Sequence, residues 1–488
     1  MKSNQILNSL TLIAVAVNVS SHAGDYSPTS PLRPSAGLVN DWFRKDDPYK
    51  AAWDIGAQAR LRFEIKENGG VSPATDFRGT GVDKDNSYLL YRVRPRIGYT
   101  AEWYNFLVEG RHSGSTGDDR NPNPESDSMD LHQAYVTLGN HKQFPLSLKI
   151  GRQELSYGDE RLIGAFAWNN IGRVFDAAKL RWQNPYFAAD FFSGRIIIAD
   201  DNNFNMPNDY DWFSGVYAST KLIPKQTTEL YLLSRNTSAG SPTVNGTGQP
   251  ALLNGPPPRD IYTVGLRMKS APGEFGNWDY TTELMGQFGH FNDPALPVGS
   301  RSLEHLAYAF FAGGGYTWTD FRYTPRVGLE YNYGSGDSDP LDDKHETFEN
   351  LFPTNHKFYG YMDFVSLQNI HNVRITSSLK PLPRLTLLGE YHAFWLADTS
   401  DNFYAVNGTR RGGISPIAGI GYGLNSTYGN YVGSEIDLVA TYAVSPQANL
   451  EVGYGHFFVG DYIDRTFSAP THGSTDADYI YIQAVFNF

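Results

Sequence analysis

Residues 477–488 read Ala-Asp-Tyr-Ile-Tyr-Ile-Gln-Ala-Val-Phe-Asn-Phe and stand last in the sequence. From Ile480 to Phe488 every second residue is apolar, and the positions between them mix polar and aromatic groups, as at Tyr479 and Tyr481. A period of two is that of a β-strand whose two faces meet different surroundings. The segment is therefore predicted to be a strand with one apolar face and an aromatic end.

Such a strand resembles the closing strand of a bacterial outer-membrane β-barrel, where the terminal aromatic residue is similar to the signal read by the barrel-assembly machinery. The composition agrees, with 14% aromatic residues, 48 Gly and a mean hydropathy of −0.41 over 488 residues. A barrel with an apolar outer face and a water-filled, polar lumen has a low mean hydropathy of this kind, because the two faces are averaged. The chain has no Cys, which excludes disulfides and thiolate metal sites. A net charge of −12 argues against a nucleic-acid partner.

The N-terminal residues 1–23 are predicted to be a secretory signal peptide. Lys2 precedes an apolar run over residues 10–19, and Ser-His-Ala at residues 21–23 forms a small-x-small cleavage site. The Pro-rich residues 24–52 are interpreted as a periplasmic lead-in, and the barrel is expected to occupy residues 53–488. No later stretch of 18 apolar residues exists, so no transmembrane helix is expected.

Alternating segments recur throughout residues 53–488 and predict an all-β, antiparallel transmembrane barrel of about 18 strands. Short and long connections alternate strictly, which is the arrangement of short periplasmic turns and long extracellular loops in such barrels. Pro95 within one strand predicts a bulge or an irregular ladder. A soluble β-sandwich or β-helix is the alternative fold. The predicted strands are residues 53–65, 91–99, 103–112, 131–138, 146–153, 173–182, 186–197, 211–220, 226–235, 260–269, 278–289, 304–318, 325–333, 371–380, 385–397, 433–444, 449–459 and 477–488.

The face opposite the apolar one is rich in Arg in the first strands, which predicts a basic lumen. Guanidinium groups bind carboxylates in a bidentate way, and rings of Arg or Lys select anions in pores. Carboxylates share this face, so ion pairs that only stiffen the wall are an equally good interpretation. The cationic candidates are Arg60, Arg62, Arg92, Arg94, Arg96, Arg111, Lys149, Arg181, Arg195, Arg235, Arg267, Arg326 and Arg374, and the acidic ones are Glu64, Glu109, Glu283, Glu330, Glu390, Glu435 and Asp437.

Several spaced motifs carry a more specific resemblance. Residues 149–164 read Lys-Ile-Gly-Arg-Gln-Glu-Leu-Ser-Tyr-Gly-Asp-Glu-Arg-Leu-Ile-Gly and are followed by Trp-Asn-Asn at residues 168–170. Residues 351–363 read Leu-Phe-Pro-Thr-Asn-His-Lys-Phe-Tyr-Gly-Tyr-Met-Asp, and residues 390–398 and 433–438 continue the series. With these motifs in this order, the chain resembles the alginate-export family of outer-membrane barrels.

The resemblance implies an eighteen-stranded barrel that exports an anionic polyuronate through an Arg-rich lumen. Its Gly-Arg-Gln motif places Arg152 at a pore-lining position, and the other matching candidates are Asp176, Lys179, Arg181 and Glu435. The partners expected are outer-membrane lipid and lipopolysaccharide, the barrel-assembly machinery, and an anionic polysaccharide or small anion. The alternative is a general or substrate-specific porin for the uptake of small anions or sugars.

Two features of the long loop at residues 334–370 bear on function. Carboxylates clustered at residues 337–343 could hold Ca²⁺, although a solvated acidic loop is the favoured interpretation and no other cofactor is expected. The aromatic part at residues 357–370 is expected to fold into the lumen as a constriction. The sequence has neither a His-Glu-x-x-His nor a Gly-x-Ser-x-Gly motif, so a channel is favoured over an enzyme.

Overall fold

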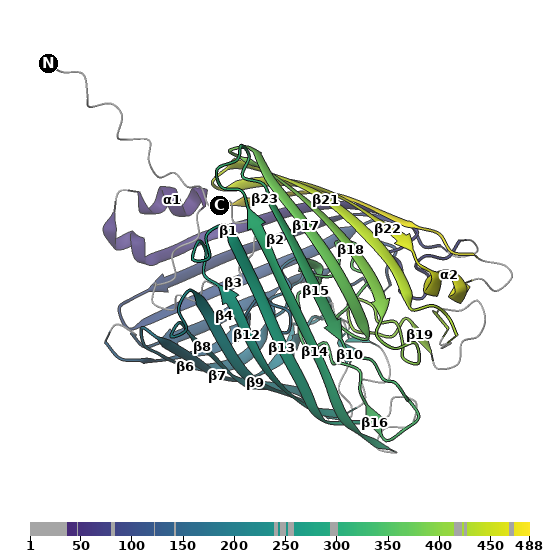
Figure 1. Cartoon of the computed structure of the whole chain (residues 1–488). Coiled ribbons are helices and arrows are strands. Elements are labelled where there is room, and N and C mark those ends of the chain that lie inside the picture. Colours follow the sequence, from purple (N-terminus) through teal and green to yellow (C-terminus); the bar gives the residue numbers. More distant parts are fainter. Residues whose placement is uncertain are drawn as a thin grey trace.

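The computed structural model describes a closed antiparallel barrel of eighteen strands (Figure 1). The residues described are 37–45, 47–79, 83–121, 123–140, 143–238, 243–244, 250–251, 258–292, 301–413, 422–423, 427–467 and 473–488. The predicted signal peptide lies outside them. The barrel strands are β1 (Trp53–Glu67), β2 (Asn86–Thr100), β3 (Tyr104–Thr116), β4 (Asp127–Leu138), β5 (Leu146–Gln153), β6 (Phe175–Gln183), β7 (Phe187–Ile198), β8 (Met206–Thr220), β9 (Gln226–Thr237), β12 (Arg259–Ser270), β13 (Trp278–Asn292), β14 (Ser302–Thr317), β15 (Arg326–Gly334), β17 (Ile370–Leu382), β18 (Leu385–Leu396), β21 (Tyr431–Ser445), β22 (Ala448–Val459) and β23 (Ala477–Asn487).

The remaining elements lie outside the ring of eighteen strands. The short strand β16 adds to β14 in parallel, and two further pairs form small sheets of their own. Among the described residues, no helix is long and apolar enough to cross a bilayer. These elements are α1 (Leu38–Arg44), η1 (Pro48–Ala52), β10 (Thr243–Val244), β11 (Pro250–Ala251), β16 (Lys344–His345), η2 (Asn355–Lys357), β19 (Gly412–Gly413), β20 (Tyr422–Gly423) and α2 (Asp461–Phe467).

The last strand closes the barrel against the first, as predicted. Arg62 lies beside Gln483 and Glu64 beside Tyr481 in the antiparallel β1–β23 ladder, and β1 also pairs with β2 along its length. Every strand therefore has two neighbours, and the sheet has no open edge in the bilayer. Ile480, on the predicted lipid face of β23, is 47% exposed, whereas Tyr481 is buried inside the barrel.

Short turns gather at one end of the barrel and long connections at the other. Helix α1 and the C-terminus lie together at the end with short turns, which is the periplasmic one (Figure 1). The side chain of Gln447 in a short turn donates a hydrogen bond of 2.9 Å to Asp41 of α1. The long connections at the opposite, extracellular end supply the segments that enter the lumen.

The structure confirms one local expectation and corrects another. Pro95 causes no bulge against β1, where it lies opposite Ala57, but Arg94 and Pro95 are both skipped in the ladder to β3, which is the predicted irregular ladder. Proline has no N–H to give that ladder, so the pairing simply stops for two residues. Arg195 does not face the lumen: it shares the parity of Phe191, which is 48% exposed, and pairs with the exposed Asp209.

Candidate functional site

Two long connections fold back into the lumen. The first inner segment is residues 154–174, between β5 and β6, and the second inner segment is residues 346–369, within the connection from β15 to β17. Nearly all their apolar side chains are buried, among them Leu155 and Phe348. The expectation that residues 357–370 enter the lumen is confirmed, and the inward fold begins about ten residues earlier. We call the two inner segments together the constriction.

The two inner segments are joined to each other by backbone hydrogen bonds. Ile163 and Phe352 form a parallel bridge in which the N–H of Phe352 donates to Leu162 at 2.9 Å and that of Gly164 donates to Phe352 at 2.8 Å. The N–H of Thr354 also donates to the carbonyl of Glu160 at 2.9 Å. These bonds satisfy backbone groups that the lumen would otherwise leave without partners.

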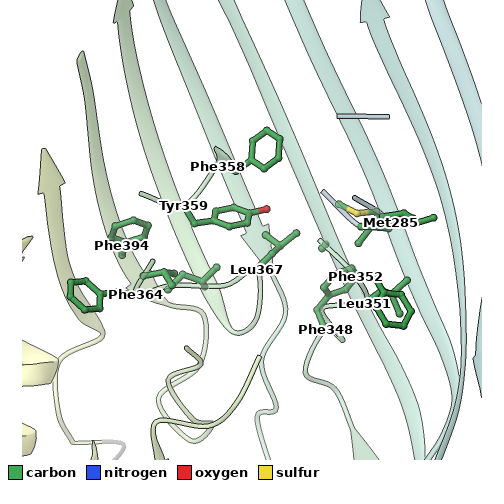
Figure 2. Close-up of a cluster of buried hydrophobic side chains, with 14 of the residues drawn as sticks. Met285, Phe348, Leu351, Phe352, Phe358, Tyr359, Phe364, Leu367 and Phe394 are labelled. Carbon is green, nitrogen blue, oxygen red and sulfur yellow. The ribbon is translucent and has the colours of Figure 1, made fainter. Parts of the chain in front are cut away.

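The second inner segment is held to the barrel wall by apolar packing. Figure 2 shows its Phe, Tyr and Leu side chains gathered against Phe394 of β18 and Met285 of β13. The ring of Phe352 meets Phe175 of β6 and Phe213 of β8 edge-on, with centroids 5.2 and 4.9 Å apart. A buried Phe contributes about 1.5–3 kcal/mol by leaving water, so this cluster fixes the second segment firmly.

The tip of the first inner segment, residues 167–171, is held instead by arginines of β1 and β2. Arg60 donates to the carbonyls of Ala167 and Asn169 at 2.9 and 3.2 Å. Arg92 donates to the same two carbonyls at 3.3 and 3.2 Å. Arg62 donates to the carbonyl of Trp168 at 2.8 Å and stacks on its ring at 3.8 Å. We call residues 167–171 the cover, because they lie over these arginines.

The cover continues along the wall onto β2 and β3. The carbonyl of Ile171 accepts from Arg94 at 3.3 Å and from Arg111 at 2.9 Å. The carbonyl of Asn170 accepts from the hydroxyl of Ser113 at 2.7 Å. Arginines of three adjacent strands thus donate hydrogen bonds to one short stretch of backbone. We call Arg60, Arg62, Arg92, Arg94 and Arg111 the arginine ladder.

The ladder is only partly neutralised by carboxylates. Arg62 pairs with Glu64 at 2.6 Å, and Arg111 pairs closely with Asp127. Within the described part of the chain, Arg60 and Arg92 form no ion pair, and the Nε of each lacks a hydrogen-bond partner. Their hydrogen bonds all go to neutral amide oxygens, and carboxylates such as Glu125 act on Arg60 without contacting it, so the cover lies in a positive potential with a capacity for anions.

Lumen-facing acids gather on a different stretch of the wall. Glu283 of β13 accepts from the hydroxyl of Tyr231 at 2.6 Å. Glu330 of β15 pairs with Arg161 of the first inner segment at 2.8 Å. Further along, Glu390 and Glu435 are both buried. The lumen therefore carries a basic stretch on β1–β3 and an acidic stretch on β13–β21, which sets up a field across the channel.

The other predicted lumen residues sit in local ion pairs. Arg96 pairs with Asp54 at 3.2 Å, and Arg326 pairs with Asp279 at 2.6 Å, both towards the periplasmic end. A second group, formed by Lys179, Arg181 and Asp190, contacts the first inner segment, since Asp190 of β7 accepts a hydrogen bond from the hydroxyl of Tyr157 at 3.0 Å. The pairs of this second group and of β17 are Lys179–Asp190 at 3.5 Å, Arg181–Asp190 at 2.8 Å and Arg374–Glu390 at 2.5 Å.

Arg152 and Asp176 are the residues for which the expectation of a pore-lining position is wrong. They are ladder partners on β5 and β6, joined by a bidentate pair at 2.9 and 3.2 Å. Alternation along β5 puts Arg152 on the face of Ile150, which is 46% exposed to the outside. The lumen position is the next one, Gln153, because a shift of one residue moves a side chain to the other face.

The carboxylates at residues 337–343 form hydrogen bonds and an ion pair within and beside their own loop. Asp337 and Asp342 accept backbone N–H bonds two residues on, and Asp343 pairs with Arg301. No three carboxylates of this stretch converge within 4.8 Å, as far as the described residues go. Burial, with help from the nearby Asp401, raises the pKa of Asp337 to about 6.

Sequence reasoning missed the cover and the arginine that braces the constriction. Arg161 donates to the side-chain oxygen of Asn332 at 2.8 Å and lies between the rings of Phe311 and Phe358, at 3.6 and 3.9 Å. Period-two alternation does not mark Arg161, because it lies in an irregular connection, although it stands within the quoted motif at residues 149–164. A weak signal existed for the cover, since Trp168 and its two following Asn residues belong to a quoted motif.

The sequence matches the family described as alginate export over residues 52–475. The chain belongs to the alginate export family. No curated protein sequence matches this chain. Similar solved structures are proteins of Pseudomonas aeruginosa. They include OccK7 (OpdD), with a TM-score of 0.53, 13% identity and coverage of 90% of this chain and 99% of that one. OccK2 (OpdF) gives a TM-score of 0.52, 12% identity and coverage of 89% and 98%.

At this identity the solved structures support the fold alone, and the family adds the cellular setting. The closed barrel with an apolar outer face and a charged, partly obstructed lumen is an outer-membrane channel of a Gram-negative cell. Family and fold together point to transport rather than catalysis.

Proposed function

We propose that this channel passes carboxylate-bearing solutes, with uronic acids and short acidic saccharides as the first candidates, along the arginine ladder. The observation that carries the proposal is the pairing of Arg60 and Arg92 with neutral carbonyl oxygens of the cover. Guanidinium binds a carboxylate more strongly than a carbonyl, since both partners are then charged and the contact is bidentate.

An incoming carboxylate can therefore take the place of the cover. Hydrogen bonds to charged groups contribute about 1.5–3 kcal/mol each. When a carboxylate replaces the carbonyls of the cover, the arginines keep the same number of hydrogen bonds and their charge is also neutralised. The cover moves away as the solute arrives, and returns when the solute leaves. Such exchange keeps the lumen closed to unselected solutes and lets a matching anion open its own path.

The packing of the second inner segment favours a small solute over a polymer. Phe352 and its apolar neighbours fill the lumen beside the wall of β6, β8 and β13, and none of these contacts is one that a sugar could replace. Export of an intact polyuronate would require the whole cluster to leave its site. Family membership nonetheless supports polyuronate export as the second candidate function.

Two partners follow from the proposal and the fold. The apolar face of β23, which ends in aromatic residues, is the surface we infer to be read by the barrel-assembly machinery. The outer face of the barrel is covered by lipid below and by lipopolysaccharide above, where Asp209 lies exposed and Arg195 is partly exposed.

Planar-bilayer recording of the purified protein tests the proposal. Anion selectivity, with current block by glucuronate and by short uronate oligomers, is expected, and neutral glucose serves as the control solute. Block by oligomers longer than the barrel, with no block by monomers, would favour the polymer route instead. Cation selectivity without block by any uronate would contradict both.

A further inference from the structure

Four lumen-facing residues on β18 and β21 form a compact group that the channel proposal does not use. Glu390 lies opposite Asp437 in the ladder, and His392 lies opposite Glu435. His392, Glu435 and Asp437 are fully buried, and Glu390 is 6% exposed. One ligand atom each from Glu390, His392 and Asp437 lie within 4.8 Å of one another.

The charges of this group are not balanced by nearby cations. Arg374 pairs with Glu390 at 2.5 Å, so one arginine offsets one of the three acids of the group. Glu435 and Asp437 have no ion-pair partner in the described part of the chain. Two uncompensated carboxylates in a dry site cost several kcal/mol each, so the arrangement is relieved either by a proton shared between them or by a positive charge from outside the chain.

Each of the two carboxylates keeps one oxygen free. The N–H of Met362 donates to Oε1 of Glu435 at 2.9 Å, and the N–H of Tyr361 donates to Oδ2 of Asp437 at 3.4 Å. The second oxygens, Oε2 of Glu435 and Oδ1 of Asp437, are buried without a hydrogen-bond partner. Buried acceptors are rarely left in this state, so these oxygens either share a proton between the two acids or bind a ligand.

Glycines keep space open above these oxygens. A Cβ on Gly455 would lie 2.9 Å from Oδ1 of Asp437, and one on Gly360 would collide with the carboxylate of Glu435. Gly360 also has a φ of +93°, which disfavours any side chain there. The backbone thus approaches the acid pair closely without covering it.

We propose that Glu390, His392, Glu435 and Asp437 bind one divalent transition-metal ion, such as Zn²⁺ or Mn²⁺. Carboxylates together with an imidazole are the donor set of these ions, whereas Ca²⁺ prefers oxygen alone. Ligand atoms around Zn²⁺ stand about 2.0–2.2 Å from the ion, so ligand atoms that lie up to 4.8 Å apart would move closer together on binding. The charge of the ion offsets Glu435 and Asp437 together.

The site has a structural consequence for the constriction. Glu435 and Asp437 hold the backbone of Met362 and Tyr361, which lie in the second inner segment. A bound ion would draw the two acids together and fasten that segment to β21. The inference is independent of the solute, since it needs neither the cover nor the arginine ladder.

Metal titration of the purified full chain in detergent tests the site. After treatment with EDTA, the protein is titrated with Zn²⁺ by calorimetry and with Mn²⁺ by electron paramagnetic resonance. We expect one ion per chain for the wild type. The control Glu349→Gln, which removes an acid already paired with Arg235 and Arg259 at 3.3 and 2.8 Å, should bind one ion as well.

The variants Asp437→Asn and Glu435→Gln should each weaken binding by at least tenfold, and both are made so that one folding failure does not decide the matter. Folding is checked by the β-sheet circular dichroism of the barrel. Wild-type protein that binds no ion at 1 mM metal (about the weakest affinity that counts as a site) would overturn the proposal. Unchanged metal binding by Asp437→Asn would also overturn the proposal. So would a wild type that binds no metal while Asp437→Asn is more stable than the wild type, because that result is expected if the two acids share a proton.

Discussion

The two inner segments fill the same lumen but are held there by different forces. The second inner segment is fixed by apolar side chains such as Phe352, whose ring lies 4.9 Å from that of Phe213. The tip of the first inner segment is fixed by arginines that donate to its carbonyls, such as Arg60 to Ala167 at 2.9 Å. Apolar contacts have no competitor in a polar solute, whereas a carbonyl competes directly with a carboxylate for guanidinium.

The difference separates a fixed element from an exchangeable one. The second segment sets the width of the lumen, and the cover sets which solutes pass. Changes in the second inner segment should alter the stability of the protein, and changes in the cover should alter its selectivity.

The largest effect is expected for Phe352→Ala, which leaves a cavity between the second inner segment and Phe175. The free energy of unfolding should fall by about 3–5 kcal/mol, as for other buried Phe residues, in equilibrium unfolding from lipid or detergent. The control Leu341→Ala removes a side chain that is 79% exposed and should change it by less than about 0.5 kcal/mol. Equal losses for the two variants would show that apolar packing does not hold the segment.

A smaller loss of stability with a larger change in current is expected for Asn170→Ala. The side chain of Asn170 donates to the carbonyls of Tyr91, Gly114 and Glu125 at 3.0, 3.2 and 3.0 Å. Its removal should cost about 1–3 kcal/mol and loosen the cover, so the open fraction of single channels should rise. An unchanged open fraction would mean that the cover does not limit the current.

The paired change Arg60→Gln with Arg92→Gln should reduce the anion-to-cation permeability ratio about thirtyfold, since each arginine contributes on the order of 1 kcal/mol to anion binding. Reversal potentials in asymmetric KCl measure this ratio. The matched control is Arg152→Gln, an arginine on the outer face, which should leave the ratio unchanged. Loss of selectivity in the control alone would reverse the assignment of faces.

The smallest effect is a pH dependence of the outer loops. Asp337 donates its backbone N–H to Asp401 at 3.1 Å, and burial raises the pKa of both carboxyls. A raised pKa favours the protonated form in the packed loop, so this stabilisation is complete below pH 4 and is lost as the pH rises through about 6. Current noise should grow between pH 5 and pH 7 in the wild type and stay flat in Asp337→Asn.

Much of the fold could be predicted because period-two alternation survives wherever a strand divides lipid from lumen. All eighteen predicted strands are present, and β1 pairs with β23 as expected. Arg152 shows the limit, because a motif does not fix parity and one residue separates it from the lumen position Gln153. The cover escaped prediction for another reason, since irregular backbone has no period and its arginine partners are distant in sequence.

In the proposed channel the cover moves and the second inner segment does not. The chain has no Cys, so Ile171→Cys and Leu351→Cys each introduce a single thiol at a buried position, 2% and 4% exposed. Reaction of each thiol with a charged, water-soluble thiosulfonate is followed with and without glucuronate. We expect glucuronate to speed the reaction at residue 171 at least tenfold and to leave residue 351 protected. Equal rates at residue 171 with and without glucuronate, or exposure at residue 351 alone, would show that the cover is not the element that moves.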